Sequence, residues 1–239
     1  MDVLVLQHAS VEHPGIFTVF FREDGARLHT VELDKGDAIP DLEPFDLMLV
    51  MGGPQDVWQE DLNPWMAGEK QAIKKYVMDM QRPFFGICLG HQLLAEAIGG
   101  RVAPSKSPEV GVMAVSKTAA GKDDHVIRNL PDPLQVLQWH GAEVTEIPAG
   151  ATILAASPAC RIQAFRFGQR AYGMQFHVEV TATTVADWAA IPEYARSLED
   201  TLGPNAMGRL DGAVSAELPQ FNRNARTLYD SLKATWTKA

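Results

Sequence analysis

Runs of aliphatic and β-branched residues alternate with amphipathic segments over the first hundred residues of the chain. Such runs predict strands that are buried on both faces of a parallel sheet, and the segments between them have the spacing of helices. The predicted strands are residues 3–6, 28–33, 47–51 and 84–88. The predicted helices are residues 16–24, residues 64–80, which Asn63 would cap ahead of Pro64, and residues 89–98, which the glycine pair 99–100 ends.

After residue 100 the pattern changes to shorter strands separated by turn residues, which indicates a mixed, partly antiparallel extension of the sheet. These strands are predicted at residues 111–115, 134–139, 152–156, 162–167 and 171–175. Beyond Glu179 the chain becomes polar and helical. Helices are predicted at 187–198 and 221–235, on either side of a stretch at 203–219 that contains glycine and proline.

These patterns predict an α/β fold with an open, mostly parallel sheet and helices on both of its faces, as in flavodoxin-like proteins. A mixed strand extension and a C-terminal helical appendage complete the predicted architecture. We expect one domain over residues 1–185, with residues 186–239 as an appendage packed on it. A chain of 239 residues is long enough to bury a core of this kind.

Charge and cysteine content narrow the class of function. The chain carries 30 acidic and 21 basic residues, a net charge of −9, which disfavours binding to nucleic acid or to an anionic membrane. Two cysteines make no disulfide framework, and no paired spacing of cysteine and histidine suggests a metal site. The first residues show neither a basic leader nor a long apolar run, so we expect a cytoplasmic protein that needs no cofactor.

Cys88 lies where a predicted strand turns into a predicted helix, in the run Gly86-Ile87-Cys88-Leu89-Gly90. A side chain on such a turn is pushed out above the sheet, and the turn needs small neighbours, here the two glycines. The N–H groups and the dipole of the helix that follows favour thiolate over thiol. This pattern predicts a nucleophile. The alternative is a buried cysteine that acts as a small hydrophobic residue.

A cysteine nucleophile needs a base, and the base needs a group that orients it. His177 and Glu179 stand two residues apart at the end of an apolar strand, so their side chains leave the same side of it. Glu179 can then hold His177 in one tautomer while the other ring nitrogen faces the thiol. Alone, this pair is more typical of a solvated strand end. Together with Cys88, it predicts a catalytic triad.

The turn Gly52-Gly53-Pro54 follows directly after the predicted strand 47–51. Because glycines carry no side chain, the backbone here can approach a substrate closely and direct N–H groups at a developing oxyanion. The N–H of Leu89, just after the candidate nucleophile, is the natural second donor. Such a sequence is also typical of an ordinary loop. Its place at the carboxyl end of a strand, where open α/β sheets bind ligands, favours the oxyanion hole.

These three motifs together resemble one known family. The Gly-Gly-Pro turn, the heptapeptide at 86–92 and the segment Gln-Phe-His-Val-Glu at 175–179 are similar to those of the class I glutamine amidotransferases, which have a Cys-His-Glu triad. Within that family the chain looks most like the stand-alone, GMP-synthase-like subgroup. The resemblance covers about residues 1–185.

The resemblance implies a reaction and a set of roles. Cys88 would attack the side-chain amide of glutamine, His177 would protonate the departing ammonia, and Glu179 would orient His177. Water would then hydrolyse the γ-glutamyl thioester to glutamate. The family's oxyanion-hole positions match Gly52 and Leu89.

Further substrate contacts follow from the same resemblance. Gln92 matches the family residue that contacts bound glutamine, and Trp139-His140-Gly141 looks like the segment whose backbone binds the α-amino and α-carboxylate groups. Judged from the residues alone, the tryptophan and the histidine of that segment are equally typical of a packed aromatic ring and a hydrogen-bonded surface histidine.

One position departs from the family pattern. The family commonly has proline between the catalytic histidine and glutamate, whereas this chain has Val178. Valine keeps an extended backbone but restores an N–H, so we expect the triad to survive with a slightly different strand end. Cys160 lacks a comparable turn and a nearby base, and His91 stands too close to Cys88 on the helix start, so both are predicted to be structural.

The acceptor of the ammonia is not encoded in any recognisable motif of this chain. It has no Gly-x-x-x-x-Gly-Lys-Ser/Thr loop, no Gly-x-Gly-x-x-Gly run and no Ser-Gly-Gly-x-Asp-Ser pattern. We therefore expect a separate synthetase or other acceptor protein. One alternative is a γ-glutamyl peptidase that hydrolyses γ-glutamyl peptides or conjugates. Another is a non-catalytic glutamine-binding module, which the complete set of Cys, His and Glu disfavours.

Overall fold

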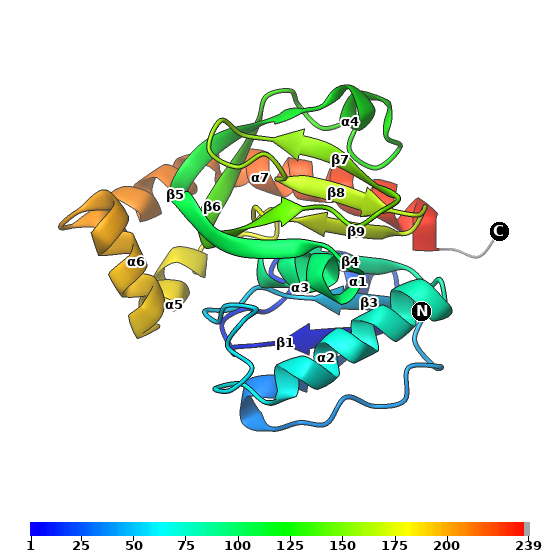
Figure 1. Cartoon of the computed structure of the whole chain (residues 1–239). Coiled ribbons are helices and arrows are strands. Elements are labelled where there is room, and N and C mark those ends of the chain that lie inside the picture. The colour runs from blue at the N-terminus through cyan, green and yellow to red at the C-terminus, as the bar shows by residue number, and fades with distance from the viewer. Residues whose placement is uncertain (237–239) are drawn as a thin grey trace.

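The computed structural model describes residues 1–236, in which a nine-stranded sheet carries helices on both faces (Figure 1). The strands are β1 (Asp2–Gln7), β2 (Arg27–Glu32), β3 (Leu47–Val50), β4 (Phe84–Ile87), β5 (Arg101–Lys117), β6 (Leu134–Glu146), β7 (Ala151–Ala156), β8 (Ala164–Phe167) and β9 (Ala171–Met174). The α-helices are α1 (Phe17–Glu23), α2 (Trp65–Lys74), α3 (Leu89–Ala97), α4 (Ala119–Asp123), α5 (Thr184–Ala189), α6 (Pro192–Leu202) and α7 (Ala206–Trp236).

The strands lie in the order β2-β1-β3-β4-β9-β8-β7-β5-β6. Strands β2, β1, β3, β4 and β9 run parallel. Strands β8, β7, β5 and β6 continue the sheet with antiparallel pairing. The predicted α/β sheet and its mixed extension are thus confirmed. The four parallel strands of the first hundred residues also begin and end within one residue of their predicted limits.

Alternate side chains of the parallel strands enter two separate cores. From β1, Val3 and Val5 pack with apolar side chains of α1 and α7. Leu4 and Leu6 point to the opposite face and pack with side chains of α2 and α3. Because both faces are covered, these strands need apolar residues at every position, which explains their unbroken hydrophobic runs.

Two strands of the second half are much longer than predicted. β5 spans 17 residues and β6 spans 13, whereas the pattern predicted only 111–115 and 134–139. The two strands pair antiparallel, and the register shifts between Pro104 and Glu109. The added length consists largely of polar, exposed positions at the edge of the sheet, where cross-strand hydrogen bonds hold the strand without an apolar pattern.

The C-terminal region differs from its prediction in two ways. The helix predicted at 187–198 is two helices, because the residue before Pro192 is held in an extended conformation that ends α5. The predicted break at 203–219 is wrong, since α7 is continuous over 31 residues and contains Pro219. Leu210 and Val214 are buried against α5 and α6, and this burial outweighs the helix-breaking composition.

The start of α2 also corrects the sequence-based expectation. The helix begins at Trp65 with Pro64 in the capping position, and no side chain caps it. The side chain of Asn63 instead donates a hydrogen bond to the carbonyl of Gln59, at 3.2 Å. The helix continues as a π-helical turn over Lys75–Asp79, so the predicted end near residue 80 is correct.

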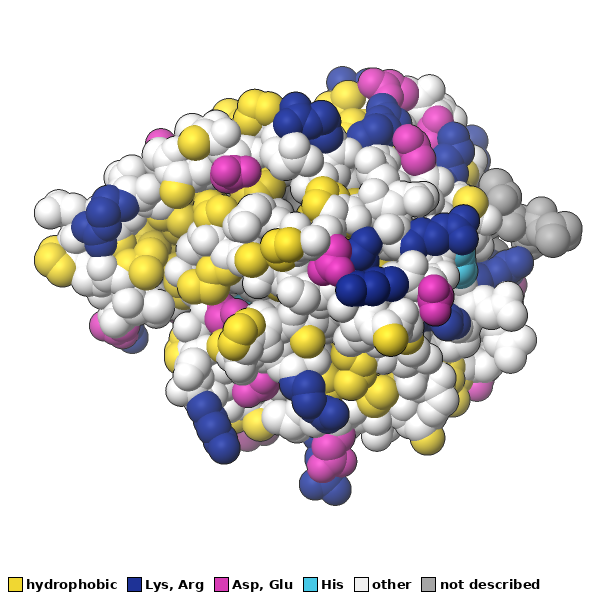
Figure 2. Space-filling model, turned by 90° about the horizontal axis from the view of Figure 1, so that it is seen from above, with side chains coloured by type: hydrophobic (Ala, Val, Ile, Leu, Met, Phe, Trp, Pro, Cys, Tyr) yellow, Lys and Arg dark blue, Asp and Glu magenta, His cyan; other side chains and the backbone are white. Residues whose placement is uncertain are grey.

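Basic and acidic side chains are interspersed over the face seen from above, with hydrophobic side chains between them (Figure 2). Within residues 1–236, no helix combines the length and the apolar character needed to cross a bilayer. Helices α5 and α6 project at one end of the sheet, beside β5 and β6 (Figure 1). This placement brings the C-terminal region next to the carboxyl ends of the parallel strands.

Candidate active site

Cys88 occupies the turn between β4 and α3 and has a strained backbone. Its φ and ψ angles are 51° and −105°, in a region that few non-glycine residues adopt. A Cβ atom at Gly86 would lie 2.4 Å from the carbonyl oxygen of Gly90, and one at Gly90 would lie 2.2 Å from that of Val50. The turn therefore excludes any larger residue on either side of the cysteine, as the sequence predicted.

The surroundings of the two cysteines differ sharply. Cys88 directly precedes α3, so its side chain lies at the positive end of the helix dipole, and it lines an open cavity. Cys160 is fully buried, and burial raises the pKa of its thiol to about 12. A thiol with that pKa forms almost no thiolate at neutral pH. Only Cys88 has the setting of a nucleophile.

His177 and Glu179 form a buried pair beneath the cavity. The Nδ1 atom of His177 lies 2.6 Å from Oε1 of Glu179, and Cys88 is the other hydrogen-bond partner of the imidazole. Burial alone would lower the pKa of His177, but the Glu179 carboxylate and the hydrogen bond to Cys88 raise that pKa well above its usual value. The imidazole is thus held in one orientation between the thiol and the carboxylate.

Val178 contributes through its backbone. Its N–H donates a 2.9 Å hydrogen bond to Oε2 of Glu179, while Oε1 of the same carboxylate accepts from His177. A proline at this position has no N–H to donate. The departure from the family pattern therefore adds a contact that fixes the carboxylate.

Two further buried side chains, Glu12 and Tyr194, adjoin this pair, and the sequence did not single them out. Glu12 lies in the segment after β1, and the hydroxyl of Tyr194 on α6 donates a hydrogen bond to it. Burial raises the pKa of the Glu12 carboxyl, against the opposing effects of His177 and of the Tyr194 hydrogen bond. The C-terminal region is thereby connected to the candidate triad.

Ligand-type atoms of Glu12, His177 and Glu179 all lie within 4.8 Å of one another. Hydrogen bonds already engage each of these side chains, since His177 is bonded to Glu179 and Glu12 to Tyr194. The cluster is best described as a hydrogen-bonded extension of the triad, and we assign no metal to it.

A cavity of about 190 Å³ opens above Cys88. Among the predicted site residues, its lining includes Gly53, Cys88, Leu89, Gln92, Trp139, His140 and Gly141. Glu193, Tyr194 and Ser197 of α6 also line it, together with Asp56. Gly52 lies just outside the lining. A larger cavity, of about 520 Å³, lies next to Arg82 and Arg170, before the amino ends of β4 and β9 and away from Cys88.

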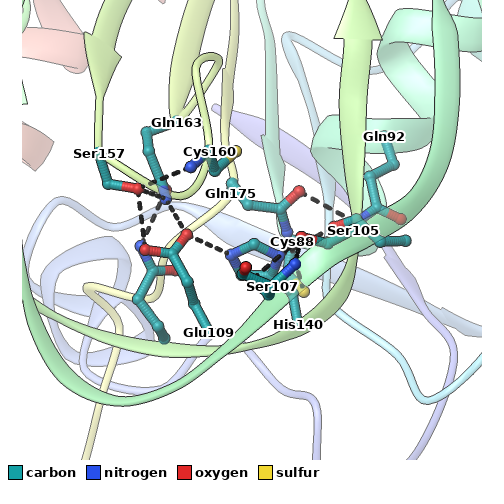
Figure 3. Close-up of polar contacts among 12 residues, drawn as sticks. Cys88, Gln92, Ser105, Ser107, Glu109, His140, Ser157, Cys160, Gln163 and Gln175 are labelled. Atoms are coloured by element: carbon teal, nitrogen blue, oxygen red, sulfur yellow. Dashed lines mark hydrogen bonds and ion pairs between the residues drawn. The ribbon is translucent and has the colours of Figure 1, made fainter.

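Gln92 and Gln175 form a polar connection to the cysteine (Figure 3). The amide nitrogen of Gln92 lies 3.0 Å from the amide oxygen of Gln175, and it also bonds to the carbonyl of Ala142. The amide nitrogen of Gln175 lies 3.6 Å from Sγ of Cys88. The Gln92 side chain is thus oriented by its neighbours at the wall of the cavity.

His140 belongs to a second polar cluster (Figure 3). Its Nε2 atom lies 3.2 Å from Oε2 of Glu109, and its Nδ1 atom lies 2.9 Å from the carbonyl oxygen of Ala142. Gln163 and Ser157 donate hydrogen bonds to the same glutamate. His140 is therefore a buried, hydrogen-bonded residue rather than a surface one, and its segment still borders the cavity.

His91 faces away from this chemistry. It is fully buried against Phe165, and burial lowers the pKa of its imidazole to about 3, so the ring stays neutral. A neutral, enclosed imidazole on the far side of α3 suits the structural role that was expected.

A buried His–Glu pair beneath a cysteine on a strand-to-helix turn places this α/β protein in the class of cysteine amidohydrolases. The family model for class I glutamine amidotransferases matches residues 19–187. The chain is also 31% identical to the glutamine amidotransferase-like protein YfeJ of Salmonella typhimurium, over 77% of this chain and 78% of that protein. The chain belongs to the class I glutamine amidotransferase family.

Solved structures agree with this assignment. A glutamine amidotransferase from Thermotoga maritima superposes with a TM-score of 0.87 at 30% identity, covering 100% of this chain and 99% of that one. A glutamine amidotransferase from Methylobacillus flagellatus superposes with a TM-score of 0.84 at 25% identity, covering 100% of this chain and 96% of that one. The C-terminal helices are therefore part of an architecture that other members of the family share.

GMP synthases are relatives of a different length. The chain is 36% identical to the glutamine-hydrolysing GMP synthase of Pseudomonas aeruginosa over 60% of its own length, but it spans only 29% of that protein. In Sulfolobus acidocaldarius a glutamine-hydrolysing GMP synthase has a shorter, separate subunit. The chain is 32% identical to that protein, over 65% of this chain and 79% of the relative.

The hydrogen bond between Tyr194 and Glu12 yields a stability prediction. Replacing Tyr194 by phenylalanine leaves a buried carboxyl without its donor, so we expect the free energy of unfolding to fall by about 1–3 kcal/mol, measured by urea denaturation. Tyr229→Phe is the matched control, because its hydroxyl bonds to Asp24, which is exposed and can turn to water instead. Equal losses in the two variants would contradict a special dependence of Glu12 on Tyr194.

Proposed function

We propose that this protein hydrolyses the side-chain amide of L-glutamine through a covalent γ-glutamyl thioester on Cys88. The sulfur attacks the amide carbon, and the thiol proton passes to His177. The tetrahedral intermediate collapses, the C–N bond breaks, and His177 returns the proton to the departing ammonia. Water, deprotonated by His177, then cleaves the thioester and releases glutamate.

The observation that carries this proposal is the position of His177. Its ring lies between the Glu179 carboxylate, 2.6 Å away, and the thiol of Cys88. A base in that position can accept and return a proton without moving. The N–H groups of Gly53 and Leu89 border the same cavity, where they can donate to the oxyanion.

Recognition of the substrate is assigned to the cavity wall. Gln92 and the segment 139–141 border the space above Cys88, together with Gly53 and Leu89. We propose that Gln92 contacts the bound glutamine and that the backbone at Trp139, His140 and Gly141 binds its α-amino and α-carboxylate groups. Ordered groups around the cavity would hold the amide above the sulfur.

We further propose that the ammonia is used by a separate acceptor protein. The support is the relationship to the Sulfolobus GMP synthase subunit, of which the chain covers 79%, together with the short span over the longer Pseudomonas enzyme. The described cavity also shows no phosphate-binding loop, and the chain carries no sequence pattern of one.

A panel of donors tests the proposal. The purified protein is incubated with glutamine, with γ-glutamyl dipeptides and with glutathione, and ammonia and glutamate are measured against heat-inactivated protein. We expect equimolar ammonia and glutamate from glutamine. Preference for γ-glutamyl peptides would identify a γ-glutamyl peptidase instead, and turnover of no donor would overturn the catalytic proposal.

A further inference from the structure

His8, a buried histidine that the mechanism above does not use, contacts the glycine turn beside Cys88. It follows β1 at the carboxyl edge of the sheet and is fully buried. Its Nδ1 atom lies 2.8 Å from the carbonyl oxygen of Gly52, and its Nε2 atom lies 2.9 Å from Oε1 of Glu69 on α2. Both ring nitrogens therefore face oxygen acceptors.

We propose that His8 and Glu69 are positioning residues for the oxyanion hole, holding the Gly52–Gly53 peptide so that the N–H of Gly53 faces the cavity above Cys88. This inference rests on the proposed function, because it assigns Gly53 as an oxyanion donor. His8 and Glu69 themselves touch no reacting atom.

The planarity of the peptide bond carries the first step. In a trans peptide the carbonyl and the N–H point in opposite directions, and the peptide between Gly52 and Gly53 is trans. A carbonyl of Gly52 that is fixed on the ring of His8 therefore aims the N–H of Gly53 away from that ring. Gly53 borders the cavity that Cys88 and Leu89 also line, so its N–H is directed to the side where the oxyanion develops.

The second step is that this peptide needs an anchor. Glycines at both positions leave the neighbouring torsions almost unrestricted, so the peptide plane could rotate at little energetic expense. Substituting a larger residue would not solve the problem, since a Cβ at Gly53 would lie 2.8 Å from Cβ of His8 and 2.9 Å from a side-chain carbon of Leu89. The orientation must come from an external hydrogen bond.

The third step is that His8 is itself immobile. Its ring stacks on Trp65 with a centroid distance of 5.4 Å and an interplanar angle of 19°. Its backbone carbonyl accepts a 3.1 Å hydrogen bond from the side chain of Gln55, two residues beyond the glycine turn. Glu69, also fully buried, fixes the remaining ring nitrogen.

Protonation agrees with this geometry. Burial alone would lower the pKa of His8, but the Glu69 carboxylate opposes burial and the pKa is raised overall. The ionisable side chains that face His8 are Glu69 from α2 and Glu12 from the segment after β1, and both favour the imidazolium. A doubly protonated ring donates to Gly52 and to Glu69 at the same time.

The test compares the kinetics of glutamine hydrolysis by the full chain and its variants. His8→Phe keeps an aromatic ring against Trp65 but removes the donor to Gly52. We expect kcat to fall about 10- to 100-fold while KM changes less than about threefold, because the lost contact acts only in the transition state. His8→Asn carries an amide N–H near the position of Nδ1, and we expect it to recover part of the lost kcat.

Tyr76→Phe is the matched control. It removes another buried hydrogen bond to a backbone carbonyl, that of Phe45, at the amino end of the sheet. We expect its kcat to stay at the wild-type value. If His8→Phe fails to fold because Glu69 loses its partner, the double variant His8→Phe/Glu69→Leu removes the orphaned charge and replaces it in the comparison.

Two results would overturn the inference: a folded His8 variant that keeps wild-type kcat, or one in which KM and kcat change together and asparagine restores nothing. The wild-type rate tests the proposed function separately. Should the wild type hydrolyse no glutamine, the Gly53 amide resonance in a ¹⁵N-labelled sample tests the positioning directly. We expect that resonance to shift in His8→Phe and to stay in place in Tyr76→Phe, and an unshifted resonance would refute the anchor.

Discussion

Replacing Cys88 by alanine is expected to lower the rate of glutamine hydrolysis by on the order of 10⁴-fold or more, because no other group can form the thioester. Binding of glutamine should survive, since the cavity walls remain in place. The measurement is ammonia release at saturating glutamine, with glutamine affinity determined by calorimetry. Alanine fits the turn as cysteine does, so the fold should be retained.

Cys160→Ala is the matched control for this substitution. Its thiol is fully buried with a pKa of about 12, and it contributes only packing. We expect wild-type turnover from this variant and a small loss of stability, about 1 kcal/mol. Residual activity of the Cys88 variant within tenfold of the wild type would refute the covalent mechanism.

His177→Asn is expected to have the second-largest effect, a loss of kcat of about 10³-fold. The substitution removes the base that exchanges a proton with Cys88 and with the leaving ammonia, and it leaves the Glu179 carboxylate without its partner. It should also slow the alkylation of Cys88 by iodoacetamide at pH 7, because the imidazolium no longer stabilises the thiolate.

His29→Asn provides the control, because His29 is exposed and pairs only with Asp2 on the far edge of the sheet. We expect this variant to match the wild type in both assays. Alkylation of Cys88 at an unchanged rate in His177→Asn would show that the histidine does not activate the thiol, whatever its effect on turnover.

The parallel core and the local motifs could be predicted from the sequence because both depend on neighbours along the chain. Strands β1, β3 and β4 are buried on both faces and are therefore visible as apolar runs. The turn at Cys88 and the spacing of His177 and Glu179 likewise involve residues close together in sequence. The assignment of their catalytic roles stays a prediction until the variants are measured.

Other features could not be predicted because their partners are distant in sequence. Glu12 and Tyr194 are separated by 182 positions, and His8 and Glu69 by 61. Nothing in a single sequence reports such a pairing. A buried acidic residue within an otherwise amphipathic helix, as Glu69 is in α2, was the one available signal.

Polar and helix-breaking positions misled the hydrophobic pattern. The outer parts of β5 and β6 are held by cross-strand hydrogen bonds, and residues 206–219 are held in α7 by the burial of Leu210 and Val214. In both cases tertiary contacts outweigh local preference. The proposed boundary at residue 185 is also a local judgement, and α7 contributes Leu228 and Tyr229 to the same core as β1.

Helix α6 provides one wall of the cavity through Glu193, Tyr194 and Ser197, whereas the segment that the family model matches ends at residue 187. The chemistry of amide cleavage and the shape of the entrance are thus specified by different stretches of the chain. Substitutions in α6 can alter which γ-glutamyl compound is admitted without touching Cys88 or His177. Relatives that share the matched segment can accordingly diverge in substrate while they retain one reaction.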